Sequence, residues 1–169
     1  MKTKTIAKLL AFWGPAMCLG AMPGLADGAQ CRHVGGGVLI DFLDQTQCTS
    51  PVGLCAEGTV SGDIRGEIGI QVLAVTTQNR TTVYHVHHHL VTDAGDMIFF
   101  GDADLTAFPT SDPNRVLADY LQGIEIVGGT GHYEGATGTV FSFGAADLKL
   151  GQITLRYAGT VCFAPVPPP

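Results

Sequence analysis

The chain has 169 residues, of which 46% are hydrophobic and 14% are charged, and its formal net charge is −6 at pH 7. It contains only nine basic residues, and these form no cluster beyond the three lysines in its first eight positions. Because binding to phosphates depends on clustered cations, this composition excludes nucleic acids and anionic membrane surfaces as partners.

The first 26 residues have the pattern of a secretory signal. Three lysines precede an apolar run, and Gly24-Leu25-Ala26 supplies the small residues that signal peptidase prefers, which predicts cleavage after Ala26. The run is short and is interrupted by Gly14-Pro15, so we do not expect a retained membrane helix. We therefore predict that residues 1–26 are removed and that the mature chain is exported to a bacterial periplasm or to the extracellular space.

Cleavage leaves 143 residues, enough for one domain, with four cysteines. An even number of cysteines in an exported chain predicts two disulfides. Of the three possible connectivities we favour Cys48–Cys55, which closes a short loop, with Cys31–Cys162, which ties the two ends of the domain together. The domain is expected over residues 27–163, and the proline-rich residues 164–169 are expected to be disordered because they cannot join a sheet.

The mature chain shows no sustained helical periodicity, and its short β-branched and aromatic runs end at turn residues. The predicted strands cover about 38–43, 57–62, 66–77, 82–92, 96–105, 116–127, 135–143 and 151–163. Eight strands of this length close into a small antiparallel barrel, which removes exposed sheet edges. We therefore predict an all-β fold with an eight-stranded antiparallel barrel.

The second half of the chain carries a glycine-rich motif. "IEIVGGTGHYEGATGTVFSF" is followed by "GQITLRYAGTVC", and the pair resembles the closing hairpin of the dirigent and allene oxide cyclase-like barrels. The resemblance covers roughly residues 120–163 and implies a calycin-like barrel with an internal apolar cavity. The first half shows no catalytic signature of the plant enzymes of this family. The resemblance therefore predicts a fold and leaves the reaction open.

Four of the six histidines lie within five consecutive positions of the predicted strand 82–92. Alternate residues of a strand share a face, so His85, His87 and His89 lie on one face and His88 lies on the other. A turn at Asn79-Arg80 would place the first three opposite the preceding strand, at Ala74, Val72 and Ile70 respectively. Whether this row faces the barrel interior or solvent is left open, because the residues on the opposite face of the strand are equally suited to pack in the core.

The strand that follows supplies carboxylates to the same row. A two-residue turn at Ala94-Gly95 would place His87 opposite Asp102 and His85 opposite Asp104. It would also place His89 opposite Phe100. His85, His87, Asp102 and Asp104 are therefore predicted to form one contiguous cluster on a single face of the hairpin.

Three roles are open for this cluster. His85 and His87 with Asp102 or Asp104 would suit a divalent transition metal such as zinc, iron or copper. Without a metal, a His–Asp pair would suit general acid–base catalysis. In the third alternative the histidines are solvated surface side chains without a chemical role. Glu125, in the middle of an apolar strand, is a further candidate for an acid in the cavity.

Three functions follow from these observations. The first is a barrel that binds an apolar small molecule without a cofactor and steers its cyclisation or isomerisation, as the resemblance implies. The second is a secreted metal-binding protein that uses His85 and His87, and the third is a non-catalytic interaction protein of the envelope. The expected partners are an apolar ligand or substrate and further copies of the chain.

Overall fold

The structure, a computed structural model, describes residues 29–165. The predicted signal segment and the last four residues of the tail lie outside the described residues. The strands are β1 (Gln30–Phe42), β2 (Cys55–Gly62), β3 (Gly66–Gln78), β4 (Thr81–Thr92), β5 (Met97–Phe100), β6 (Ala103–Pro109), β7 (Arg115–Asp119), β8 (Ile124–Gly129), β9 (Thr137–Asp147) and β10 (Gln152–Phe163). Two single-turn 3-10 helices complete the secondary structure, η1 (Gln45–Gln47) and η2 (Gly131–Tyr133).

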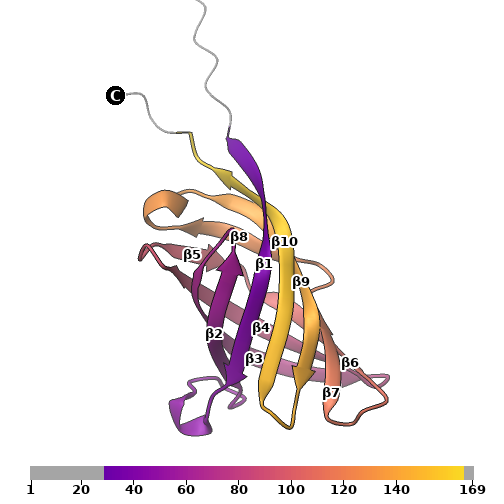
Figure 1. The fold of residues 1–169 in the computed structure, drawn as a ribbon. Helices are drawn as coiled ribbons and strands as arrows, with labels where there is room; N and C mark the ends of the chain where they lie inside the picture. Colours follow the sequence, from indigo (N-terminus) through magenta and orange to yellow (C-terminus); the bar gives the residue numbers. More distant parts are fainter. Residues whose placement is uncertain (1–28, 166–169) are drawn as a thin grey trace, which may run out of the picture.

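The strands form one closed antiparallel barrel, in which β1 and β10 lie side by side (Figure 1). Eight strands follow one another around the ring in the order β1, β2, β3, β4, β5, β8, β9 and β10. The remaining two, β6 and β7, pair with each other and connect β4 to β9. The predicted fold class, an all-β eight-stranded antiparallel barrel, is therefore confirmed.

Two of the predicted strands are each broken in two. The predicted strand 96–105 consists of β5 and β6, separated at Gly101-Asp102, and the predicted strand 116–127 consists of β7 and β8. Between β7 and β8 the chain makes a turn, in which Gly123 N donates to Tyr120 O over 2.9 Å and Gly123 has a φ of +76°. The breaks allow β5 to pair with β8 while β6 pairs with β7.

Strand β1 begins at Gln30, well before the predicted start at residue 38. Its first half contains three consecutive glycines, which lower the strand propensity of the sequence. In the barrel this half pairs with β10 along its whole length, from Gln30 opposite Phe163 to Gly37 opposite Arg156. Long-range pairing therefore overrides the local preference.

Both predicted disulfides form. Cys31–Cys162 joins the first and last strands at directly opposite positions, and Cys48–Cys55 closes the loop that precedes β2. Within residues 29–165, no helix has the length and apolar character needed to cross a membrane.

The end of the barrel that carries the turn between β2 and β3 is closed by packed side chains, and we call it the closed end. There the Tyr157 hydroxyl accepts a hydrogen bond from Ile64 N over 2.9 Å and donates one to Ile64 O over 3.2 Å. The Tyr157 ring passes over Gly36, where an added side chain would collide with it. We call the opposite end, which carries the turn between β9 and β10, the open end.

Candidate functional site

The histidine row lies on the outer face of β4. His85 Nδ1 is 2.9 Å from Asp104 Oδ1, His87 Nδ1 is 2.7 Å from Asp102 Oδ1, and the His85 and His87 side chains are 46% and 49% exposed. A third contact, of 3.8 Å, joins His85 Nε2 to Asp102 Oδ2. The predicted single-face cluster is therefore confirmed, and it faces solvent rather than the barrel interior.

The predicted register between β4 and the following strand is only partly right. Thr92 N donates to Asp96 O over 2.8 Å, so the loop has three residues, 93–95, and the predicted two-residue turn is wrong. His89 consequently faces Phe99 instead of the predicted Phe100. An extra residue at the break between β5 and β6 cancels this offset, and His85 faces Asp104 as predicted.

A bulge changes the register on the other side of β4. The turn at Asn79-Arg80 forms as predicted, with both residues at positive φ, and His85 faces Ala74. A β-bulge between Val72 and Ala74 then shifts the pairing by one residue. His87 and His89 therefore face Gln71 and Gly69, and the predicted pairing with Val72 and Ile70 is wrong.

The other predicted site residue, Glu125, is also exposed, on the outer face of β8, and does not line the barrel interior. The described residues, 29–165, contain no group of three or more His, Cys, Asp or Glu side chains arranged to hold a metal ion. The metal site predicted for His85, His87 and Asp102 therefore stays a hypothesis.

The remaining histidine of the run, His88, lies inside the barrel and is 3% exposed. Its Nε2 is 2.7 Å from the Tyr120 hydroxyl, and its ring meets the Phe100 ring in a T-shaped contact with centroids 6.1 Å apart. Burial of the imidazole, with a smaller contribution from neighbouring His87, lowers the pKa of His88 to about 4. The imidazole is therefore neutral at pH 7.

Tyr120 and Ser142 complete a polar layer with His88. Tyr120 and Ser142 are 1% and 4% exposed, and Tyr120 N donates to Ser142 O over 2.9 Å, which makes the two residues cross-strand neighbours. Burial raises the pKa of the Tyr120 hydroxyl above its usual value, so it stays protonated. Within residues 29–165, two buried side-chain polar atoms lack a hydrogen bond, and they are His88 Nδ1 and Ser142 Oγ.

The three polar side chains line a small cavity of about 50 Å³, which we call the inner chamber. Its other walls are mainly apolar residues such as Ile40, Ile70 and Leu155, and none of the described residues that line it is charged. A second cavity of about 260 Å³, the outer chamber, lies toward the open end and is lined almost entirely by apolar side chains.

The two chambers are consecutive layers of one barrel interior. Ile70 lines both of them. On β4 the outer chamber contacts Val86 and the inner chamber contacts His88, two residues further along the strand. Alanines at inward-facing positions, such as Ala118 and Ala146, leave the outer chamber its volume, because larger side chains would fill it.

Comparison with family models, with curated proteins and with solved structures finds no match to this chain. The resemblance to the dirigent and allene oxide cyclase-like barrels therefore stays an interpretation of the glycine-rich motif.

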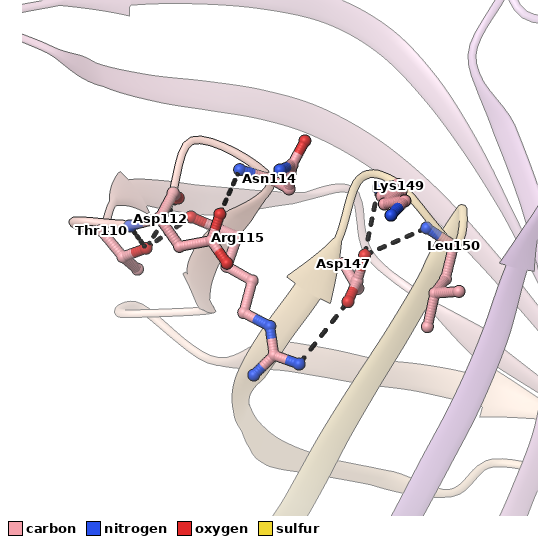
Figure 2. Close-up of polar contacts among 7 residues, drawn as sticks. All are labelled: Thr110, Asp112, Asn114, Arg115, Asp147, Lys149 and Leu150. Atoms are coloured by element: carbon pink, nitrogen blue, oxygen red, sulfur yellow. Dashed lines mark hydrogen bonds and ion pairs between the residues drawn. The ribbon is translucent and has the colours of Figure 1, made fainter.

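Two hydrogen-bonded loops form part of the rim at the open end (Figure 2). Asp147 Oδ1 accepts hydrogen bonds from Lys149 N and Leu150 N over 3.1 and 3.0 Å, and Arg115 Nη2 reaches Asp147 Oδ2 at 3.6 Å. Leu148, which lines the outer chamber, donates its backbone N–H to Asn114 O over 2.8 Å. These contacts tie the loop after β6 to the loop after β9 beside Leu148 of the outer chamber.

The polar layer was not predicted from the sequence, although two of its three members leave a signal. His88 interrupts the apolar stripe of Val86 and Leu90 on β4, and Ser142 interrupts that of Val140 and Ala146 on β9. A lone polar residue at an inward-facing position costs free energy unless something satisfies it, so it indicates a site. The three neighbouring histidines on the opposite face of β4 drew the interpretation away from His88.

Proposed function

We propose that this chain is an exported barrel that binds an apolar small molecule in its interior. The outer chamber takes the apolar body of the molecule, and the polar layer of His88, Tyr120 and Ser142 takes its polar group. The observation that carries the proposal is the pair of unpartnered polar atoms, His88 Nδ1 and Ser142 Oγ, on side chains that line the inner chamber, next to the apolar outer chamber.

The energetics of burial support this reading. Leaving a buried polar group without a hydrogen bond costs about 1–3 kcal/mol, so natural proteins satisfy such groups with protein, ordered water or a ligand. The chambers measure about 260 and about 50 Å³, close to the lower end of the roughly 300–1,000 Å³ found for small-molecule sites. The ligand is therefore small, and the absence of charged side chains from the inner chamber matches an uncharged polar group.

The cysteines support the exported location in the proposal. All four cysteines of the mature chain are paired, and disulfides form and persist in oxidising compartments. A periplasmic or extracellular barrel would meet its ligand outside the cytoplasm.

Steering a cyclisation or isomerisation of the bound molecule is a second candidate function. An enclosed apolar site promotes such reactions by holding one conformer of the substrate and by excluding water. The neutral His88–Tyr120 pair favours this candidate, because it places a proton donor and acceptor at the cavity wall. Chromatography of a reactive substrate on a chiral phase, with and without the protein, would reveal a change in product stereochemistry.

The binding proposal is tested with the mature protein prepared in its oxidised form. Native mass spectrometry and calorimetric titration with neutral medium-chain ketones, alkenes and monoterpenes are expected to give a one-to-one complex with micromolar or tighter affinity for at least one compound. Circular dichroism checks that the protein is folded. Folded protein that binds none of the panel would contradict the proposal and would favour a non-catalytic interaction protein.

A further inference from the structure

We propose that the inner chamber recognises the carbonyl oxygen of an uncharged ligand, with the His88 Nδ1–H and the Ser142 hydroxyl as its two donors. This inference rests on the proposed function, because it requires a ligand inside the barrel. It adds the chemical class of that ligand, an apolar ketone, aldehyde or ester.

The hydrogen-bond network around Tyr120 assigns the tautomer of His88. A neutral imidazole has one N–H donor and one acceptor nitrogen, and the Tyr120 hydroxyl contacts Nε2 at 2.7 Å. If Tyr120 donates to Nε2, the proton of His88 lies on Nδ1, and a single N–H is left without a partner. If Nε2–H donates instead, both the Tyr120 O–H and the Nδ1 lone pair are left unsatisfied. The first arrangement leaves fewer orphaned groups, so Nδ1 carries the proton.

The second donor is the hydroxyl of Ser142, whose backbone carbonyl bonds to Tyr120 N. Ser142 Oγ is buried without a partner, and its residue is the cross-strand neighbour of Tyr120, which itself bonds to His88. Both side chains line the inner chamber. A serine hydroxyl rotates to suit its partner and donates readily to an acceptor placed within the chamber.

A carbonyl oxygen fits this pair of donors better than other polar groups do. It accepts two hydrogen bonds and donates none, so it satisfies both atoms without bringing another unsatisfied donor into the cavity. A carboxylate or an ammonium group would be buried without a counter-ion, because the lining of the inner chamber contains no charged residue.

The test compares two ligands of nearly the same shape, cyclohexanone and its alkene isostere methylenecyclohexane, by calorimetric titration of the mature, oxidised protein. Two neutral hydrogen bonds are expected to make the ketone bind about 10- to 100-fold more tightly. Ser142→Ala is expected to weaken the ketone about three- to tenfold and to leave the alkene within about twofold. Ser61→Ala, at an exposed position on β2 outside both chambers, is the control and should change neither affinity.

A second measurement tests the tautomer of His88 and requires no ligand binding. Histidine labelled with nitrogen-15 reports its tautomer by long-range correlation spectroscopy, and His88→Gln identifies the signals of His88. The protonated Nδ1 tautomer is expected, and a protonated Nε2 would overturn the inference. Equal affinity for ketone and alkene would overturn it too while leaving the proposed function intact. Failure of both ligands and of the whole neutral panel would contradict the proposed function itself.

Discussion

The His88 imidazole lies 2.7 Å from the Tyr120 hydroxyl inside the barrel, and this contact joins β4 to the turn that follows β7. Each group is the other's hydrogen-bond partner in a region where both are almost fully buried. The contact therefore fixes the orientation of the only imidazole ring that lines the two chambers.

Removal of the Tyr120 hydroxyl tests the contribution of this contact. Tyr120→Phe leaves the buried imidazole without a hydrogen bond at either nitrogen, so the free energy of unfolding is expected to fall by about 1–3 kcal/mol. Urea denaturation measures the change. Tyr84→Phe is the control, because Tyr84 is half-buried on the same face of β4 as His88. An equal loss of unfolding free energy in both variants would argue against a specific role for the His88–Tyr120 contact.

The stability of the protein is expected to depend on the protonation of His88. Its pKa is about 4 in the folded protein and 6.5 in an unperturbed histidine, so between these values the unfolded chain binds a proton that the folded chain does not. The contribution of this group is fully present above pH 6.5 and is lost as pH falls toward 4, by up to about 3 kcal/mol. In His88→Phe, the free energy of unfolding should depend less on pH in this window. Urea denaturation at several pH values measures it, and the same pH dependence in the variant and the original protein would refute the lowered pKa of His88.

Adjacent histidines on opposite faces of β4 give a matched pair of variants. His87→Ala removes a solvent-exposed side chain and is expected to change stability by less than about 0.5 kcal/mol. His88→Ala removes a buried, hydrogen-bonded ring and is expected to cost at least about 2 kcal/mol. Thermal unfolding compares the two. Elemental analysis of untagged protein that shows a metal lost in His87→Ala would instead support the metal hypothesis.

Filling the outer chamber tests where the ligand lies. Ala146→Leu places a larger side chain in the chamber and is expected to weaken ligand binding at least about tenfold, with little loss of stability because a chamber of about 260 Å³ accommodates the added atoms. Ala145→Leu makes the same change at the next residue, which faces outward, and should leave affinity unaltered. Calorimetric titration with the best compound of the neutral panel measures both, and equal affinities would place the ligand elsewhere.

The two disulfides are expected to differ in their contribution to stability. Cys31 and Cys162 are 131 residues apart in the sequence and Cys48 and Cys55 are 7 apart, so the first closes a far longer loop in the unfolded chain. Replacing each pair by serine is expected to cost about 5 and about 2 kcal/mol respectively. Urea denaturation gives these values, and two or more free thiols in the unreduced, denatured mature protein would contradict the pairing.

The exposed cluster of His85, His87, Asp102 and Asp104 shows how local sequence patterns predict contacts. His85 faces Asp104 as predicted, yet the loop between their strands is one residue longer than expected. The prediction survives because the extra residue at Gly101-Asp102 restores the register before Asp104 is reached. On the β3 side a bulge shifts the register and nothing restores it, so the predicted partners of His87 and His89 were wrong. Bulges depend on the neighbouring strands, and a single strand's sequence does not reveal them.

The sequence by itself determined the all-β class and which residues share a face of β4, because strand alternation and turn chemistry are local properties of the chain. Only the tertiary structure decided which face is inside. Both faces of β4 offered an acceptable core, and the choice depends on how all the strands close and which side chains then fill the interior. The inner chamber exists for the same reason: His88, Tyr120 and Ser142 come from distant parts of the chain, and only barrel closure brings them together.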